Sequence, residues 1–410
     1  MNSTNDQETW VLCDTLFTPY QRLTGWLLCI LHGKIHRMLP AAEGAAIPTD
    51  KLIYQPGAIV APGFIDLHVH GASGCDLMDG TANALRGTAQ TLARYGTTSF
   101  LATTVSAPDA DLETAVRGLA AHADDVTEGA SPIGIHMEGP YLNPACRGTH
   151  DASSLRKAEL QSFLRWVEIS GNTIRRLTIA PEMDPGLQLI RAASELGIQV
   201  SLGHSDASED QARAAVDAGA TQTTHTFNAM RPFHQRAPGI LGIALTDDRI
   251  YSEVIADGIH VHPVAIHLLL RAKGLERTAL VTDGTSAVGM PDGSYPLGGK
   301  LIEVRNGECR DREGHLAGST LTLDRAVRNL IEWLDVPLHE ALTVASATPA
   351  RCMRMGHKKG IVSPGADADF VFLDRNLQVI QTMVGGCIVY RRPPASDLQH
   401  ASFDLRTPNP

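Results

Sequence analysis

Short apolar runs and amphipathic helical stretches alternate through the middle of the chain, and this rhythm restricts its fold more than any other feature. Runs rich in apolar or β-branched residues recur at 64–68, 97–104, 133–138, 176–181, 199–204, 221–225, 251–256 and 279–283. Stretches with helical spacing of apolar residues lie between them, at 84–95, 111–123, 158–170, 186–196, 209–218 and 263–273. Strands that alternate with helices form parallel sheets with helical crossovers. The eight runs therefore predict an α/β fold, a (β/α)8 TIM barrel over residues 61–357.

The two ends of the chain carry further strand patterns, but neither end has enough strands to close a sheet alone. Near the N-terminus these patterns lie at 10–12 and 26–30, and near the C-terminus at 369–373 and 388–390. Apolar and β-branched runs bounded by turn residues are typical of strands. We expect the two ends to pair into one small discontinuous β-sandwich domain, made of residues 1–60 plus 358–410, beside the catalytic barrel.

Charge and cysteine spacing narrow the class of protein. The chain has 35 Lys and Arg residues against 45 Asp and Glu residues, a net charge of −10. A chain with no overall positive field is not expected to bind nucleic acid or a membrane surface. Its cysteines are far apart without a Cys-x-x-Cys pair, and no apolar run of about 18 residues occurs. These features predict a cytoplasmic protein without a disulfide framework.

The predicted barrel strands end in an unusual set of metal-binding side chains. In a barrel of this type, catalytic groups lie at the carboxyl ends of the strands. The strand ends supply His68, His70, Glu138, His204, His225, His260 and Asp283. Side-chain direction repeats every two residues along a strand, so His68 and His70 can hold one ion together. Imidazoles combined with a carboxylate suit a divalent metal such as zinc or ferrous iron, and the sequence therefore predicts a metal site.

These residues stand within longer motifs that are specific in combination. The motifs are PGFIDLHVHG at 62–71, HMEGPYLN at 136–143, GHS at 203–205, THTFNAM at 224–230, DGIH at 257–260 and TDG at 282–284. With them, nearly the whole chain resembles the amidohydrolase superfamily, and within it the deacetylases of N-acetylated amino-sugar 6-phosphates. The resemblance implies hydrolysis of N-acetyl-D-glucosamine 6-phosphate to D-glucosamine 6-phosphate and acetate, in amino-sugar catabolism.

The resemblance also implies roles at the metal. Glu138, His204 and His225 would be the ligands of the principal ion. His68 and His70 would hold a second ion bridged by Glu138, because a carboxylate has two oxygens. Members of the family hold one or two ions, and the sequence leaves open whether this chain binds one ion or two. Zinc is the expected metal, with iron or another divalent ion as the alternative.

Hydrolysis of an acetamide needs a nucleophile, polarisation of the carbonyl and a proton for the leaving amine. A bound divalent ion supplies the first two, because it lowers the pKa of water to about 7 and acts as a Lewis acid. We expect Asp283 to take the proton from that water and deliver it to nitrogen. By resemblance, His260 contacts the substrate and helps to polarise its carbonyl.

Substrate contacts are expected from several loops. The chain has no P-loop pattern, so discrete groups must bind the phosphate. By resemblance, Arg236 would reach the phosphate in a neighbouring subunit, which implies a homodimer, and arginine suits phosphate through its planar fork. The other expected substrate contacts are Thr149, His150, Asn228, Ala229, His260, Leu316, Ala317 and Gly318.

Several rival functions stay open in the sequence. N-acetylgalactosamine 6-phosphate differs by the configuration of one hydroxyl, which motifs do not determine. Another amidohydrolase acting on an N-acylated amine is a second alternative. Dihydroorotases and hydantoinases bridge two metals with a carboxylated lysine after the fourth strand, where this chain has Ile-Ala-Pro-Glu at 179–182. A non-catalytic scaffold would lack ligands, and none is missing.

Overall fold

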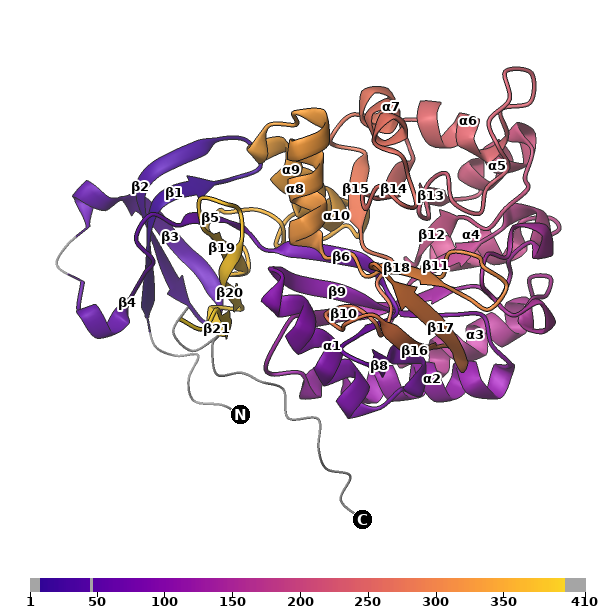
Figure 1. Cartoon of the computed structure of the whole chain (residues 1–410), viewed down its shortest axis with the longest axis horizontal. Helices are drawn as coiled ribbons and strands as arrows, with labels where there is room; N and C mark the ends of the chain where they lie inside the picture. Colours follow the sequence, from indigo (N-terminus) through magenta and orange to yellow (C-terminus); the bar gives the residue numbers. More distant parts are fainter. Residues whose placement is uncertain (1–7, 45–46, 395–410) are drawn as a thin grey trace, which may run out of the picture.

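The computed structural model describes residues 8–44 and 47–394, and its larger part is a barrel of eight parallel strands (Figure 1). These are β6 (Phe64–Val69), β9 (Thr97–Thr104), β10 (Ser131–Glu138), β11 (Ile174–Ile179), β12 (Gln199–Leu202), β13 (Ala220–Thr223), β14 (Tyr251–Ile255) and β15 (Thr278–Val281). Neighbours in the chain are neighbours in the sheet, and a parallel bridge between Val69 and Gly284 joins the last strand to the first. The predicted barrel is confirmed.

Helices cover the outside of the barrel (Figure 1). They are α1 (Ala82–Arg94), α2 (Asp109–His122), α3 (Leu160–Ile169), α4 (Gln188–Glu195), α5 (Glu209–Asp217), α6 (Gly239–Thr246), α7 (Pro263–Lys273), α8 (Leu323–Leu334), α9 (Leu338–Ala345) and α10 (Ala347–Cys352). The helical stretches predicted from the sequence do not include α6 or the last three helices. The α6 sequence, GILGIALT, is apolar almost all round, so it lacks the one-sided pattern of an amphipathic helix.

A three-stranded insertion separates β15 from α8, and the sequence did not predict it. Its strands are β16 (Gly293–Leu297), β17 (Lys300–Arg305) and β18 (Glu308–Arg310), which pair antiparallel in chain order. A two-stranded ribbon, β7 (Gly71–Ala72) with β8 (Cys75–Asp76), follows β6. Because the insertion interrupts the strand–helix rhythm, the helix after β15 begins far along the chain.

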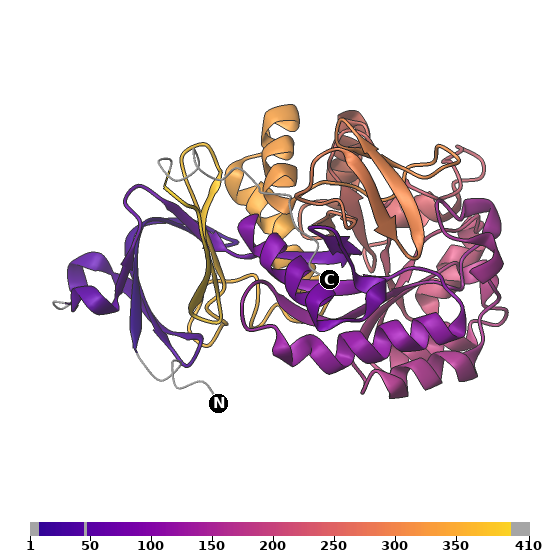
Figure 2. The ribbon, with the colours of Figure 1, turned by 60° about the horizontal axis from the view of Figure 1, so that its bottom comes forward.

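Strands from both ends of the chain form one mixed sheet beside the barrel. They are β1 (Thr9–Phe17), β2 (Arg22–Leu31), β3 (Lys34–Pro40), β4 (Leu52–Tyr54), β5 (Ile59–Pro62), β19 (Phe370–Leu373), β20 (Val379–Val384) and β21 (Cys387–Arg391). The pairing of β5 with β19 joins the two ends, and Figure 2 shows the N-terminal strands facing the C-terminal ones. The composite β-domain is thus confirmed, while its predicted boundaries stay a prediction. Residues 1–7, 45–46 and 395–410, within the predicted domain, lie outside the described residues.

Strand β19 is buried on both faces, and its side chains pack against both the β-domain and the barrel. Phe370 and Phe372 point into the core of the β-domain, together with residues of β1, β2 and β3. Val371 and Leu373 point the other way, into a core that contains residues of β14, β15 and α8. Side chains on a strand alternate between faces, so a run of apolar residues can serve two cores at once.

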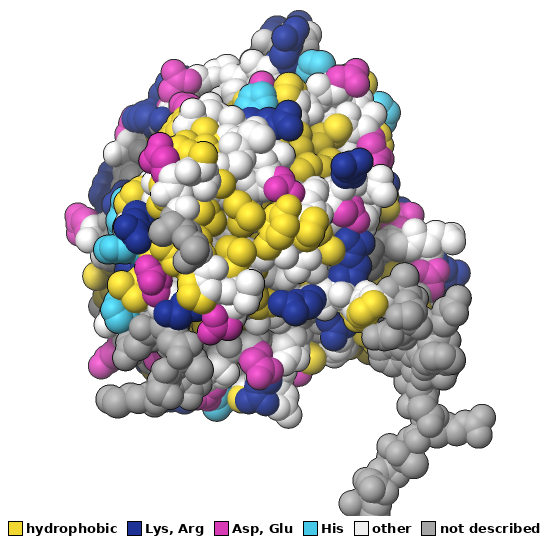
Figure 3. All heavy atoms as spheres, turned by 90° about the vertical axis from the view of Figure 1, so that its left-hand side faces the viewer, with side chains coloured by type: hydrophobic (Ala, Val, Ile, Leu, Met, Phe, Trp, Pro, Cys, Tyr) yellow, Lys and Arg dark blue, Asp and Glu magenta, His cyan; other side chains and the backbone are white. Residues whose placement is uncertain are grey.

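The outer face of the β-domain is also apolar in part. Trp10, Leu27 and Cys29 are buried there beneath partly exposed side chains that include Leu12 and Leu52. Figure 3 views this end of the molecule and shows apolar side chains gathered among scattered charged ones. In the part of the chain that the structure describes, every helix is too short or too polar to cross a membrane.

Candidate active site

A cavity of about 440 Å³ opens at the carboxyl ends of the barrel strands. Its floor brings together side chains that are far apart in the sequence. They are His70 beyond β6, Glu138 at the end of β10, His204 beyond β12, His225 beyond β13 and Asp283 beyond β15. His68, in β6, lies beneath them and is fully buried. Six of the seven expected metal-binding and catalytic residues thus meet in one place, and the seventh, His260, lies on the cavity wall.

One cluster consists of Glu138, His204 and His225. The Nε2 atoms of His204 and His225 lie 3.0 Å apart. They lie 3.2 Å and 3.1 Å, respectively, from Oε1 of Glu138. Ligand atoms placed about 2.0–2.1 Å from a tetrahedral ion are roughly 3.3 Å from one another. The spacing and the donor chemistry of this cluster therefore fit a divalent metal.

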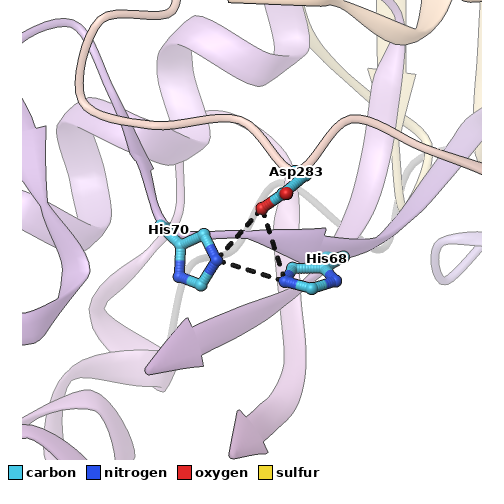
Figure 4. Close-up of side chains that lie close together, drawn as sticks. All are labelled: His68, His70 and Asp283. Carbon is cyan, nitrogen blue, oxygen red and sulfur yellow. Dashed lines mark hydrogen bonds and ion pairs between the residues drawn. The ribbon is translucent and has the colours of Figure 1, made fainter. Parts of the chain in front are cut away.

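A second cluster consists of His68, His70 and Asp283 (Figure 4). The two imidazole Nε2 atoms lie 3.1 Å apart. Oδ1 of Asp283 is 3.1 Å from Nε2 of His70 and 3.5 Å from Nε2 of His68. Figure 4 shows the carboxylate and both rings pointing toward one another. This donor set also fits a divalent ion.

Glu138 lies between the two clusters. Its Oε1 is 3.4 Å from Nε2 of His68, and its Oε2 is 3.4 Å from Nε2 of His70. Burial opposes ionisation of this carboxyl, but the surrounding imidazoles hold its pKa well below its ordinary value. The two buried clusters around one shared carboxylate are consistent with a binuclear metal site.

The backbone bends sharply where three of these side chains leave their strands. His204, His225 and Asp283 have φ angles of 48°, 30° and 51°. Residues other than glycine rarely adopt this left-handed region, and such conformations cluster at functional sites. The bend lets a side chain beyond the end of a strand turn back over the barrel mouth.

Hydrogen bonds to other groups orient the imidazoles. Nδ1 of His204 donates to the carbonyl oxygen of Cys146 at 2.8 Å, which leaves its Nε2 lone pair facing the cluster. The backbone N–H of Ser106 donates to Nδ1 of His150 at 3.1 Å. The Nε2 hydrogen of His150 therefore faces Oε2 of Glu138, 3.3 Å away. Burial lowers the pKa of His150 to about 4, so this imidazole is neutral.

Asp257 orients His260 at the cavity wall. Nδ1 of His260 donates to Oδ2 of Asp257 at 2.7 Å, and the backbone N–H groups of Ile259 and His260 donate to Oδ1. Burial lowers the pKa of His260, but the Asp257 carboxylate outweighs it and raises the pKa above its ordinary value. Because Nδ1 donates to Asp257, His260 can donate from Nε2 only as the imidazolium, which is the form that the raised pKa favours.

Most of the expected substrate contacts line the cavity, namely Thr149, His150, Asn228, Ala229, His260, Leu316 and Gly318. Ala317 does not line it, because its side chain is fully buried in a small core behind the insertion. Arg236 is exposed on the loop before α6 and lies outside the cavity of its own chain. Sequence reasoning missed three further side chains that line the cavity, those of Arg147, Lys300 and His315. Lys300 lies on the unpredicted insertion, so no motif could have located it.

Glu138→Gln should remove metal from both clusters, because the shared acceptor would lose its charge and one of its two acceptor oxygens. We expect the metal content of the purified protein, measured by elemental analysis, to fall well below that of the unmodified chain. Glu182→Gln is the matched control, since Glu182 accepts hydrogen bonds from Asn143, Ser205 and Asp206 and contacts neither cluster. Full metal content in Glu138→Gln would contradict the bridging arrangement.

Comparison with known proteins agrees with this geometry. The sequence pattern of the amidohydrolase family matches residues 59–389. The N-acetylglucosamine-6-phosphate deacetylase of Vibrio furnissii is 40% identical over 329 residues, which cover 80% of this chain and 82% of that protein. The N-acetylgalactosamine-6-phosphate deacetylase of Escherichia coli O157:H7 is 40% identical over 328 residues, covering 80% and 87%.

A solved structure has the same fold over almost its whole length. It is a mutant of the N-acetyl-D-glucosamine-6-phosphate deacetylase of Mycobacterium smegmatis, in complex with N-acetyl-D-glucosamine-6-phosphate. Its TM-score is 0.86 at 33% identity, and the alignment covers 93% of this chain and 99% of that chain. With a family pattern that spans both the barrel and the returning strands, the chain belongs to the amidohydrolase family.

Proposed function

We propose that this chain is a metal-dependent deacetylase that hydrolyses N-acetyl-D-glucosamine 6-phosphate to D-glucosamine 6-phosphate and acetate. The observation that carries the proposal is the pair of buried clusters around Glu138 at the floor of a cavity. The cavity wall adds the cationic side chains of Arg147 and Lys300 and the imidazole of His315, which suit an anionic substrate. The named activities of the relatives in Vibrio furnissii and Mycobacterium smegmatis support the same substrate.

Glu138, His204 and His225 would hold one ion, and His68, His70 and Asp283 a second. Zinc is the metal we propose, because imidazole and carboxylate ligands in a buried site suit it. A divalent ion held there polarises an amide carbonyl and makes hydroxide available at neutral pH.

Asp283 is the proposed proton carrier. Burial opposes its ionisation, but His68 and His70 hold its pKa below its ordinary value, so the carboxylate is ionised and can accept a proton. It lines the cavity, where it can take a proton from water and pass it to the amide nitrogen as the C–N bond breaks. His260, held by Asp257, would donate a hydrogen bond to the carbonyl oxygen as negative charge develops there.

The phosphate end of the site is proposed to be shared between two subunits. Arg236 is exposed outside its own cavity, which is the position an arginine would need to reach a neighbouring chain. We therefore propose a homodimer in which each chain supplies Arg236 to the other. A cytoplasmic location is part of the same proposal, supported by the thiols of Cys13, Cys75, Cys146 and Cys352, which form no disulfide.

Acetate release from N-acetyl-D-glucosamine 6-phosphate tests the function. The galactosamine epimer and the unphosphorylated sugar are assayed in parallel, with one preparation before chelation, after chelation and after return of zinc. We expect turnover that requires the phosphate, disappears on chelation and returns with the metal. The relative in Escherichia coli O157:H7 makes the galactosamine epimer the second candidate. A higher kcat/KM for that epimer would identify it as the preferred substrate. No turnover by metal-loaded protein would refute the proposal.

Asp283→Asn should lower kcat by about 10²- to 10⁴-fold, because the neutral amide cannot accept the proton. The isosteric change should leave KM for the phosphorylated sugar much less affected. Steady-state kinetics with metal analysis of the same sample separates a lost base from a lost ion. A variant with near-normal kcat would remove Asp283 from the proposed role.

Arg236→Ala should raise KM for the phosphorylated sugar by about 10- to 100-fold, the size of a lost charge-assisted hydrogen bond. Turnover of the unphosphorylated sugar should change little. Arg213→Ala, which removes an exposed arginine from α5, is the control. Mixing Arg236→Ala with Asp283→Asn chains should restore activity, because each mixed dimer would contain one complete site. Equal effects on both sugars would exclude Arg236 from the phosphate site.

A further inference from the structure

A buried ion pair crosses the inside of the barrel directly beneath the metal clusters. It joins Arg176 of β11 to Glu253 of β14, two strands that are separated in the sheet by β12 and β13. Both side chains are buried, with exposures of 0% and 2%. The Arg176 guanidinium also donates to the carbonyl oxygen of Leu67 at 3.2 Å and to Oγ of Ser201 at 2.9 Å. The Glu253 carboxylate is therefore held from the far side of the barrel.

A contribution to folding stability does not explain why the Arg176–Glu253 ion pair is present. Barrel interiors are filled mainly by branched apolar side chains. Taking two charges out of water costs several kcal/mol per ion, and apolar replacements of buried pairs are often neutral or stabilising. The Coulomb attraction between Arg176 and Glu253 is thus weak evidence for a structural role. A function that needs a carboxylate at this position accounts better for the pair.

The free oxygen of Glu253 faces the histidines above it. Its Oε2 is 3.7 Å from Nδ1 of His68, within ion-pair distance although longer than a hydrogen bond. The same oxygen accepts the backbone N–H of His225 at 3.2 Å. Within the described residues, Nδ1 of His68 has no hydrogen-bond partner. Glu253 is the carboxylate toward which that ring nitrogen points.

A carboxylate on this side determines which nitrogen of His68 carries the hydrogen. An ionised carboxylate only accepts hydrogen bonds, so it favours the tautomer with the hydrogen on Nδ1. Nε2 then keeps its lone pair, and that atom faces His70 and Asp283. Metal-ligating histidines usually donate their other ring N–H to a carboxylate, a carbonyl or water. Glu253 lies on the side of the His68 ring where such a partner is expected.

The other cluster depends on Glu253 much less. His204 is oriented by the carbonyl oxygen of Cys146, on the opposite side of its ring from the cluster. For His225, Glu253 contacts the backbone nitrogen and not the imidazole. Glu253 thus faces the imidazole of His68 in one cluster and only the backbone of His225 in the other.

We propose that Glu253, held in place by Arg176, is a positioning residue that orients His68 for metal binding, so that the ion of the His68/His70/Asp283 cluster depends selectively on this buried pair. The inference rests on the proposed metal centre. It adds that the occupancy of the two clusters can be separated by changing residues that line neither the cavity nor the clusters themselves.

The test uses the full-length chain and counts bound Zn²⁺ by elemental analysis, with affinities from competition against a chelating dye. Glu253→Gln keeps the size of the side chain, but its amide can donate to Nδ1 of His68 and so favour the wrong tautomer. We expect one ion to stay tightly bound and the second to bind about 10- to 100-fold more weakly. Ser201→Ala is the matched control, because it removes the hydrogen bonds of Ser201 with Arg176 and Thr224 without touching Glu253, and it should keep both ions.

A second variant distinguishes weakened metal binding from a folding defect. Arg176→Met/Glu253→Leu removes both charges together, so no buried ion is left unpaired. The change also leaves the backbone N–H of His225 without its acceptor, so we expect cooperative thermal unfolding without metal at a lower temperature than that of Ser201→Ala, while the second ion is again weakened. A double variant that binds both ions as tightly as the unmodified chain would overturn the proposal, and so would one that cannot fold where Ser201→Ala folds.

The unmodified chain separates this inference from the proposed function. If it holds two ions and releases acetate, the comparison of variants decides the role of Glu253. If it releases acetate with only one ion bound, the inference is overturned while the deacetylase function stands. If it binds no metal, both fail.

Discussion

The site depends on one constraint: the negative charge of a buried carboxylate must be stabilised by neighbouring groups. Glu138 is almost fully buried, and an isolated anion there would be strongly unfavourable. Imidazole nitrogens from His68, His70, His150, His204 and His225 face it at 3.1–3.4 Å. These residues come from four separate parts of the chain, so the carboxylate can be satisfied only when the barrel has closed. The site is therefore complete only in the closed barrel.

The β-domain contributes to the site through the entry of the first barrel strand. Strand β5 pairs with β19 and runs into β6 after a single residue, Gly63, whose N–H donates to the carbonyl oxygen of Asp369 at 3.0 Å. Strand β6 carries His68 and leads directly to His70. Because β19 is packed into both cores, the C-terminal return of the chain helps to hold the strand that supplies these two histidines.

A layer of hydrogen-bonded polar side chains supports the histidines from within the barrel. Nε2 of His136 lies 2.7 Å from Oγ1 of Thr178, which lies 2.7 Å from Oγ1 of Thr224. Burial and the nearby Arg176 charge lower the pKa of His136 well below its ordinary value, so it stays neutral. His136 precedes Glu138 by two residues, but it belongs to this polar layer and to neither of the two clusters. Polar networks of this kind are rigid when every member is paired.

The strand–helix rhythm and the motifs at the strand ends were sufficient to predict the barrel, the paired chain ends and the residues that meet at the mouth. That was possible because periodicity is local and because a closed parallel barrel collects its strand ends at one face. Helix α6, the β16–β18 insertion and the buried Arg176–Glu253 pair required the tertiary structure. An all-apolar helix and an insertion carry no periodic signal, and a charged residue in a strand does not reveal its partner three strands away. The sequence by itself determined which chemical groups the site contains, whereas only the folded barrel decided their distances, their protonation and which oxygen faces which nitrogen, since these depend on contacts between residues far apart in the chain.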